Sequence, residues 1–417
     1  MSDSDIGRVV IVGSGQAGVE TAAALRQQGF AGSVTIVGEE PDLPYQRPPL
    51  SKEFLKSAED SSLPLKGEAF YAGNGIELRL GVVAERIDRT RRQLVLTGGE
   101  SLAYDRLVLA TGARNRLPPV PGLDPARVLE LRTLAHARAL TARLPGLRRV
   151  AIVGGGFIGL EVAALLRQRD IEVDVLEAAD RLMGRVLSPA MSAAFLRFHD
   201  EMGTRIHLAT LAREIAPRAD GFWLALTGGG TLDVDAVVVA AGVVPNVELA
   251  AAAGLAVDNG ISVDAMLLTS DPAISAIGDC AAHPNPYGDA NGSGGPIRLE
   301  SVQNAVDQAK CVAARLTGNR QAYDALPWFW SHQGPIKLQI AGLSLGMDET
   351  VTRGDPAGEK FSVFVYRKGR LAAVESVNSP ADHMVARRLI AAGITVPPEV
   401  AADPATDLRA LMPKAAA

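Results

Sequence analysis

Two stretches of the chain, Arg8-VVIVGSGQAGVETAAALRQQ-Gly29 and Arg149-VAIVGGGFIGLEVAALLRQR-Asp170, share one layout. Each has a short valine- and isoleucine-rich run, a glycine turn and an alanine- and leucine-rich segment, and a second apolar run follows from Ser33 or Glu172. This layout predicts two strand–helix–strand units. Because the apolar runs are continuous rather than alternating, we expect parallel strands buried on both faces beneath helices.

Further apolar runs, at 105–113 and 236–246, complete the two units, and the proline-rich segment 115–122 links them. The fold class predicted is α/β, with two Rossmann-like dinucleotide-binding domains and a C-terminal α+β domain. In that last domain we expect strands at 336–342 and 361–376 and a helix at 381–392. The expected boundaries are 1–114 with 245–322 for the first domain, 115–244 for the second and 323–417 for the third. A helix is also predicted at 304–316 and a loosely packed tail at 397–417.

The composition excludes several classes of protein. Among 417 residues there are only two cysteines, Cys280 and Cys311, so neither a disulfide framework nor a thiolate zinc site is expected. The net charge of -5 disfavours nucleic acid and anionic membranes as partners. Residues 1–6 lack the basic and then apolar layout of a signal peptide, and no apolar run reaches the roughly 20 residues of a membrane helix. We therefore expect a cytoplasmic protein.

The first glycine motif is Gly13-Ser-Gly15-Gln-Ala17-Gly18, and Glu39 ends the next apolar run. In a dinucleotide site the first glycine makes the turn, the second admits the pyrophosphate and the third lets the helix approach the strand. The helix N-terminus then faces the phosphates, and the acid accepts hydrogen bonds from a ribose. Strand, turn, helix and acid together predict a dinucleotide site.

The second motif, Gly154-Gly-Gly156-Phe157-Ile158-Gly159 with Glu177, repeats this constellation. Two dinucleotide sites in one chain predict a flavin and a nicotinamide, and hence an electron-transfer enzyme. An acid at Glu177 favours NADH over NADPH, whereas Arg181 or Arg185 could accommodate a 2′-phosphate.

Several other motifs are distinctive: Pro44-YQRPPLS-Lys52, Leu109-AT-Gly112, Leu131-R-Thr133, Ile277-GD-Cys280, Arg298-LESVQN-Ala305 and Pro327-WFW-Ser331. With the two glycine motifs, they make the chain resemble the FAD-dependent, NADH-using ferredoxin reductases of bacterial oxygenase systems. That family includes putidaredoxin-reductase-like enzymes and the reductases of Rieske-type dioxygenases. The resemblance runs from about residue 7 to 395 and implies a glutathione-reductase-like fold.

The resemblance implies a role for individual residues. Lys52 is expected beside the flavin with Glu161 within its reach, and Trp330 is expected near the flavin. The residues expected to bind FAD are Gly13, Gly15, Ala17, Gly18, Glu39, Arg47, Lys52, Ala84, Thr111, Gly112, Arg132, Asp279, Val302 and Trp330. Those expected to bind NADH are Gly154, Gly156, Phe157, Ile158, Gly159, Glu177, Arg185 and Gly242.

The sequence departs from the family pattern at His332, where relatives commonly carry aspartate, and we expect that histidine to be structural. Cys280 and His283 have the spacing of two metal ligands, but without a second pair we expect no metal site. Trp328 is expected to be a core aromatic residue.

The resemblance implies an NADH–ferredoxin oxidoreductase whose partner is an acidic [2Fe-2S] ferredoxin serving a cytochrome monooxygenase or a Rieske dioxygenase. A monomer or weak homodimer is expected. The arginines available for a basic docking patch are Arg86, Arg89, Arg91, Arg92, Arg148, Arg149, Arg387 and Arg388.

Other functions remain open on the same scaffold. Disulfide reductases, peroxide reductases and NADH oxidases need a reactive thiol near the flavin, and no cysteine precedes Cys280. A rubredoxin or monodehydroascorbate reductase needs no thiol. A non-enzymatic protein of the apoptosis-inducing-factor type would be expected to show a targeting segment and a basic surface, and neither is visible in the sequence.

Overall fold

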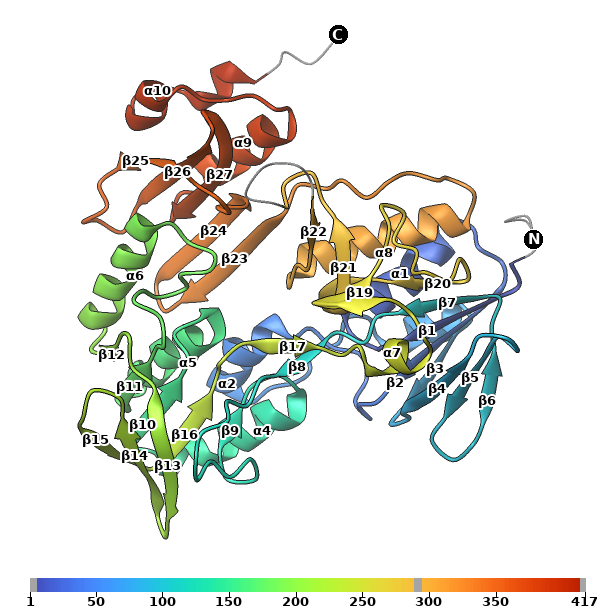
Figure 1. The fold of residues 1–417 in the computed structure, drawn as a ribbon, viewed down its shortest axis with the longest axis horizontal. Coiled ribbons are helices and arrows are strands. Elements are labelled where there is room, and N and C mark those ends of the chain that lie inside the picture. Colours follow the sequence, from blue (N-terminus) through green and yellow to red (C-terminus); the bar gives the residue numbers. More distant parts are fainter. Residues whose placement is uncertain (1–5, 289–294, 413–417) are drawn as a thin grey trace. The chain divides into compact units, whose positions relative to one another are not determined.

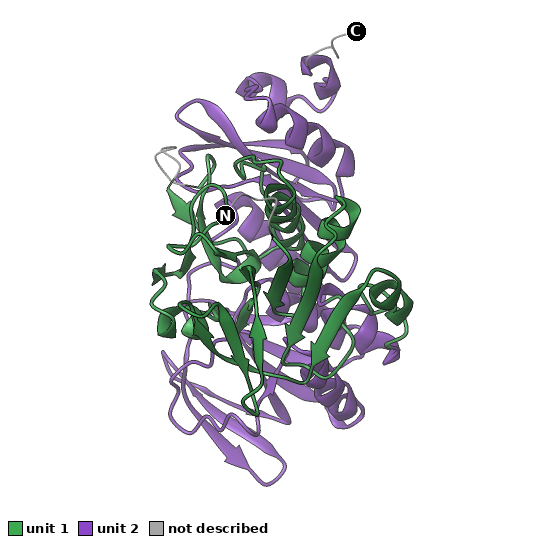
Figure 2. Ribbon diagram, turned by 90° about the vertical axis from the view of Figure 1, so that its right-hand side faces the viewer, with its two compact units in different colours: residues 1–46, 60–114, 244–327 green, residues 47–59, 115–243, 328–417 purple. Residues whose placement is uncertain are grey.

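The structure is a computed structural model that describes residues 6–288 and 295–412. The chain divides into two compact units, coloured separately in Figure 2. Unit 1 comprises residues 1–46, 60–114 and 244–327, and unit 2 comprises residues 47–59, 115–243 and 328–417. The chain passes between the units five times, and two of these crossings fall within β8 (Ala113–Asn115) and β17 (Val243–Pro245). Residues 1–5, which belong to the N-terminal segment expected not to be a signal peptide, lie outside the described ranges.

Unit 1 is built on a five-stranded parallel sheet of order β20-β7-β1-β2-β3 (Figure 1). Its central strand β1 is buried over Val9–Val12, as expected for a strand covered on both faces. The helices α1 and α8 pack together in the apolar core on one side of this sheet. These elements are β1 (Arg8–Val12), α1 (Gln16–Gln27), β2 (Ser33–Gly38), β3 (Ile76–Leu80), β7 (Arg106–Leu109), β20 (Ile274–Ala276) and α8 (Val302–Leu316).

Smaller elements complete unit 1. A three-stranded antiparallel sheet, β4-β5-β6, packs its apolar side chains into a second core. The remaining elements are α3 (Glu68–Gly73), β4 (Ala84–Asp88), β5 (Gln93–Leu96), β6 (Ser101–Ala103), α7 (Glu248–Ala252), β18 (Val257–Asp258), β19 (Gly260–Ser262), η4 (Gly278–Cys280), β21 (Ala281–Pro284) and β22 (Pro296–Ile297).

Unit 2 repeats the parallel sheet, with order β12-β11-β10-β16-β9. It also contains the short segment 47–59. The elements of this part are η2 (Pro48–Ser51), α2 (Glu53–Ser57), β9 (Leu129–Glu130), α4 (Leu134–Arg143), η3 (Leu144–Gly146), β10 (Arg149–Val153), α5 (Phe157–Arg167), β11 (Glu172–Leu176), α6 (Pro189–Glu201), β12 (Arg205–His207), β13 (Ala212–Arg218), β14 (Gly221–Leu226), β15 (Thr231–Val234) and β16 (Ala236–Val239).

The C-terminal part of unit 2 is an antiparallel sheet of order β23-β24-β27-β26-β25, and α9 packs against it. Its elements are β23 (Trp328–Gln333), β24 (Ile336–Gly342), β25 (Glu349–Gly354), β26 (Phe361–Arg367), β27 (Arg370–Val377), α9 (Pro380–Ala391), α10 (Pro398–Ala402) and η5 (Leu408–Leu411).

The expectation of a loosely packed tail is wrong for residues 397–412. The buried guanidinium of Arg353 donates hydrogen bonds to the carbonyl groups of Asp403, Pro404 and Thr406, and Ala401 and Leu408 are buried. One cation thus satisfies several carbonyl groups of a segment without regular structure. Residues 413–417 lie outside the described ranges.

The predicted fold class is confirmed, with two parallel strand–helix–strand sheets and an antiparallel C-terminal sheet. Two boundaries differ from the sequence expectation. The run 236–246 forms two strands because Gly242 turns the chain with a φ of +89°. The helix expected at 304–316 begins at Val302, since Ser301 caps it by accepting a hydrogen bond from the Asn304 amide. Within the described ranges no helix is long and apolar enough to cross a membrane.

Candidate functional site: two glycine turns and a buried lysine–glutamate pair

The first glycine turn has the backbone that a dinucleotide requires. Gly13 has a φ of +117°, and a Cβ there would lie 2.1 Å from the Ala110 carbonyl oxygen. A Cβ on Gly18 would lie 1.9 Å from the Gly13 oxygen, so neither position tolerates a side chain. A Cβ on Gly15, at the N-cap of α1, would meet no heavy atom within 4 Å. Gly15 therefore leaves room beside the start of α1, as a pyrophosphate bound to the helix amides would require.

The second turn repeats this geometry in unit 2. Gly154 also has a φ of +117°, with an added Cβ 2.3 Å from the Ala240 oxygen, and Gly159 is packed as tightly against Gly154. Gly156, the N-cap of α5, has open space where its Cβ would point. Beside it, the ring of Phe157 packs at a tilted angle against that of Phe329, with ring centroids 4.6 Å apart, and Ile158 is 44% exposed. Two glycine turns of the same geometry are therefore present, one in each unit.

The two acids, however, are held differently. Glu39 is exposed directly after β2. Glu177 is half-buried, and its carboxylate accepts hydrogen bonds from the backbone amides of Gly155 at 2.7 Å and Ala179 at 2.8 Å. The strand registers also place the two acids at different distances beyond the paired ends of the strands. Val12 pairs with Val37, two residues before Glu39, whereas Val153 pairs with Leu176, directly before Glu177.

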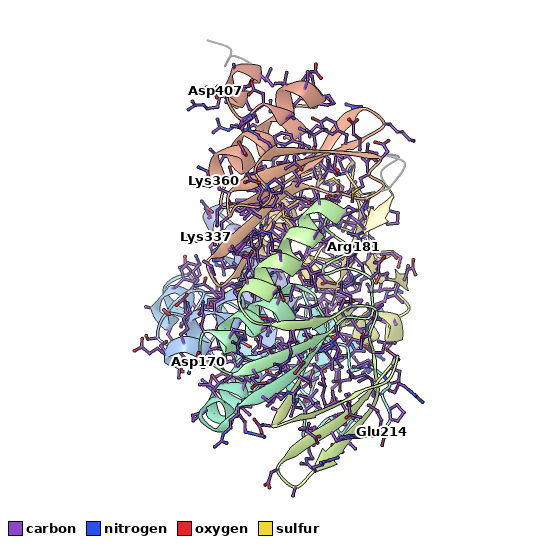
Figure 3. The ribbon with its side chains drawn as sticks, turned by 90° about the vertical axis from the view of Figure 1, so that its left-hand side faces the viewer. Asp170, Arg181, Glu214, Lys337, Lys360 and Asp407 are labelled. Carbon is purple, nitrogen blue, oxygen red and sulfur yellow. The ribbon has the colours of Figure 1, made fainter. Side chains whose placement is uncertain are left out.

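Arg181 and Arg185 are not equivalent. Arg181, in the segment after β11 (Figure 3), donates hydrogen bonds to the Leu187 carbonyl at 2.6 Å and the Gly184 carbonyl at 2.6 Å. Its guanidinium thus holds the segment together. Arg185 is exposed, with a terminal nitrogen 3.5 Å from the Cβ position of Gly242. Arg185 and Gly242, both predicted to bind NADH, therefore lie close together.

Unit 1 brings Asp279 to the first glycine turn. A Cβ on Gly278, which has a φ of +74°, would lie 3.1 Å from the Ala17 Cβ, so the η4 turn passes the start of α1. Asp279 itself is half-buried, and Val302 begins α8. This arrangement fits a carboxylate that accepts hydrogen bonds from a polyol chain near the pyrophosphate.

The end of β7 is fixed by a residue that the sequence did not single out. The hydroxyl of Thr111 donates to the Asn246 carbonyl at 2.7 Å, and the Asn246 side chain donates to the Thr111 carbonyl at 2.8 Å. Gly112 follows with a φ of +66°. Ala84, also predicted to contact FAD, begins β4 and is half-buried.

In unit 2, Lys52 and Glu161 form the predicted pair. The Nζ atom of Lys52 lies 2.6 Å from Glu161 Oε2, and the Ser51 hydroxyl donates to the same oxygen. The other oxygen, Oε1, accepts from the Ser331 hydroxyl at 2.7 Å and from the His332 amide at 3.3 Å. The carboxylate therefore has four donors although Glu161 is only 4% exposed. Such pairing makes burial of the two charges tolerable.

Other residues implied by the resemblance also lie in unit 2. Arg47 donates to the Arg132 carbonyl at 2.6 Å. Trp330 is half-buried on β23 with its ring centroid 5.5 Å from that of Trp328. Trp328 is half-buried too, and the Arg387 guanidinium lies 4.4 Å from its ring centroid. The His332 side chain is only partly exposed; its partial burial lowers its pKa, and Lys52 and Lys337 lower it further.

Ser51 and Ser331 lie inside the quoted motifs, but their roles were not predicted. Their hydroxyls complete the coordination of Glu161, which lies 110 and 170 positions away along the chain, respectively. The available signal was weak: each serine borders a residue singled out for other reasons, Lys52 or Trp330.

The two cysteines are poor nucleophiles. Cys280 is fully buried, and burial raises its pKa; burial also raises the pKa of Cys311. A raised pKa keeps a thiol protonated and unreactive. His283 is buried against Gln308, and among the described residues no group of three or more potential metal ligands is found.

Several arginines of the expected docking patch are already paired. Arg86 and Arg91 contact Asp88 at 3.7 and 3.0 Å, and Arg89 contacts Asp271 at 2.7 Å. Arg149 likewise contacts the buried Asp174 at 3.2 Å. These ion pairs reduce the positive potential that the sequence suggested.

Comparison with known proteins identifies the relatives of this chain. Residues 7–309 match the family described as pyridine nucleotide-disulphide oxidoreductase, and residues 328–412 match the reductase C-terminal family. The chain belongs to the pyridine nucleotide-disulphide oxidoreductase family. It is 50% identical to rhodocoxin reductase of Rhodococcus erythropolis over 404 residues, 96% of this chain and 93% of that one.

Solved structures agree with this assignment. The ferredoxin reductase for the CYP199A2 system of Rhodopseudomonas palustris matches with a TM-score of 0.94 and 47% identity, covering 98% of this chain and 100% of that one. Putidaredoxin reductase in its covalent complex with putidaredoxin matches with a TM-score of 0.93 and 38% identity, covering 97% and 98%. The resemblance inferred from the sequence is confirmed.

The family membership makes this protein an oxidoreductase that uses FAD and a pyridine nucleotide. The two open glycine turns fit two dinucleotides, because each presents helix amides toward space that a side chain would fill.

Proposed function

We propose that the protein is a cytoplasmic NADH–ferredoxin reductase that supplies electrons to an oxygenase through a [2Fe-2S] ferredoxin. The observation that carries the proposal is the combination of two open glycine turns with thiols that burial keeps protonated. A chain of this family without a reactive thiol has no internal disulfide to reduce, so its electrons must leave to an external acceptor. The names of its relatives favour a ferredoxin as that acceptor.

Each part of the candidate site has its own role in this proposal. The turn at Gly15 would hold the FAD pyrophosphate and the turn at Gly156 would hold that of NADH, each at the amide end of a helix. FAD, when bound, supplies exchange between two-electron and one-electron chemistry. In the role that the family resemblance implies for it, the Lys52 ammonium would stabilise negative charge on the reduced flavin, and Glu161 would orient Lys52. Glu177 accepts hydrogen bonds from the adenosine ribose of NADH.

NADH is favoured over NADPH for two reasons. The Glu177 carboxylate would repel a 2′-phosphate, and the Arg181 guanidinium is already bound to the carbonyl groups of Leu187 and Gly184. Only Arg185, of the two arginines considered, is left to contact a phosphate. We therefore expect kcat/KM for NADH to exceed that for NADPH.

The test is acceptor reduction by the purified, FAD-loaded enzyme. Stopped-flow mixing with NADH should bleach the flavin, and cytochrome c reduction should require added [2Fe-2S] ferredoxin. Rubredoxin and ascorbyl radical serve as competing acceptors under the same conditions. A faster reaction with either of these, or no flavin bleaching by NADH, would contradict the proposal.

The ferredoxin-binding face needs cations that are not already paired. Lys66 and Lys310 line a groove of about 300 Å³ in unit 1, and the Lys66 ammonium lies 5.5 Å from the Phe70 ring centroid. We propose that an acidic ferredoxin uses these charges. Lys66→Glu and Lys310→Glu should slow ferredoxin reduction most at low salt, whereas Lys360→Glu, on an exposed turn, should not. Equal effects of all three variants would contradict this docking face.

A further inference from the structure

The strand β23 places two polar side chains in the interior of unit 2. Ser331 and Gln333 are both fully buried, whereas His332 between them is exposed. This alternation is that of a strand, whose successive side chains point to opposite faces. The strand β23 packs against α5, which carries Glu161. The two buried side chains therefore lie on the face of β23 that is directed toward Glu161.

These side chains form a continuous hydrogen-bonded chain that ends at Glu161. The oxygen of the Gln333 amide lies 2.8 Å from Nε2 of His199, and the Gln333 nitrogen lies 3.2 Å from the Ser331 hydroxyl. The Ser331 hydroxyl lies 2.7 Å from Glu161 Oε1. His199 comes from α6 and is fully buried.

The direction of every bond in this chain is fixed. An ionised carboxylate only accepts, so the single Ser331 hydrogen goes to Glu161 and the hydroxyl accepts from the Gln333 nitrogen. The Gln333 oxygen must then accept from a protonated Nε2 of His199. Burial lowers the pKa of His199, which keeps its ring neutral, and no described residue bonds its Nδ1. The His199 end of the chain is therefore buried and neutral, and the fixed directions of its bonds orient Ser331 toward Glu161.

We propose that Ser331 and Gln333, with the Gln333 amide oriented by His199, are positioning residues that hold Glu161 Oε1 and so fix Lys52 on Oε2. This inference rests on the proposed function, which places Lys52 beside the flavin. Without the Ser331 hydroxyl, the His332 amide at 3.3 Å is the one donor to Oε1 that remains within the described ranges. A buried carboxylate that loses a donor moves toward its remaining donors, and the paired ammonium moves with it.

The experiment compares Ser331→Ala with Ser362→Ala in the FAD-loaded protein. Ser362 is also a buried serine of the C-terminal sheet, but it bonds Ser376 and Asp382 instead of Glu161. The midpoint potential of bound FAD is measured by chemical reduction, without NADH or ferredoxin. Ser331→Ala should shift the potential to more negative values and slow flavin reduction by NADH roughly tenfold. Ser362→Ala should change neither, and Ser331→Thr, which keeps the hydroxyl, should restore both.

A double-mutant cycle with Lys52→Met shows whether Ser331 acts through Lys52. In the Lys52→Met background, Ser331→Ala should cause no further shift. An unchanged potential in Ser331→Ala, or the same shift with and without Lys52, would overturn the inference. If Ser331→Ala does not fold, Gln333→Met provides the same comparison at similar side-chain volume. The midpoint potential is measured without any electron acceptor. An unchanged potential would therefore contradict the role of Ser331 without bearing on whether the protein reduces ferredoxin.

Discussion

The Lys52 ammonium lies 2.6 Å from the Glu161 carboxylate, and the two side chains are 17% and 3% exposed. The pair joins Lys52, between η2 and α2, to α5 across 109 positions of sequence. Each charge makes the burial of the other tolerable, so the pair both anchors residues 47–59 within unit 2 and fixes a cation.

Glu161→Gln should therefore destabilise the protein by about 2–3 kcal/mol, because it leaves the ammonium without its counterion. The double variant Lys52→Met/Glu161→Gln should recover part of that loss, since no uncompensated charge remains. Urea denaturation of each protein gives the free energies of unfolding. A double variant less stable than Glu161→Gln would contradict this account of the pair.

Gly15→Ala and Gly156→Ala should separate the two dinucleotide sites. Neither added methyl meets protein atoms within 4 Å, so each variant should lose less than about 1 kcal/mol of stability. Gly15→Ala should weaken FAD binding, seen as loss of the flavin absorbance. Gly156→Ala should stay yellow and show a raised KM for NADH. The opposite pattern would reverse the assignment of the two domains.

Glu177→Ala should raise the KM for NADH roughly tenfold with a smaller change in kcat, because it removes the ribose acceptor and releases the amides of Gly155 and Ala179. It should not make NADPH the better substrate, since Arg181 remains bound to its own segment. Steady-state kinetics with NADH and with NADPH gives the KM and kcat values for both nucleotides. A reversal of preference in the single variant would show that Arg181 is free to bind phosphate.

Asp174 should make stability depend on pH in the acid range. Burial opposes ionisation of this carboxyl, but hydrogen bonds from Arg205 and His207 outweigh burial and lower its pKa below 3.8. A lowered pKa stabilises the fold above that value, and the contribution is lost as the pH falls through the folded-state pKa. Asp174→Asn should cost about 1–2 kcal/mol at neutral pH, because both partner arginines are partly exposed. The difference from the native protein should shrink below about pH 4.

Glu375 should make the stability of the protein depend on pH in the opposite direction. It is fully buried on β27 and accepts hydrogen bonds from Ser188 and Ser344, yet burial raises its pKa. A raised pKa favours the protonated fold, so this contribution is present at pH 4.5 and below and is lost as the pH rises toward the folded-state pKa. Glu375→Gln should therefore gain stability relative to the native protein as the pH rises. Denaturation curves from about pH 5 to 8 that run parallel for the two proteins would contradict this.

The sequence predicted the features that depend on local chemistry. The glycine turns at Gly13 and Gly154 need positive φ and close backbone approach, which only glycine supplies, so spacing alone located them. Continuous apolar runs likewise predicted buried parallel strands. The family resemblance then supplied Lys52 with Glu161. The assignment of FAD and NADH to particular residues stays a prediction.

The tertiary structure alone decided which polar groups, far apart in sequence, become hydrogen-bond or ion-pair partners. Three examples join segments that are distant in sequence. Ser331 and Gln333 connect to Glu161 through hydrogen bonds. Arg353 donates to carbonyl groups near the C-terminus, and Arg89 pairs with Asp271. A serine, glutamine or arginine carries no sign of its partner, because the same side chain serves equally well in water. Burial forces each buried group to find a specific donor or acceptor, and the folding of the chain alone determines which one is within reach.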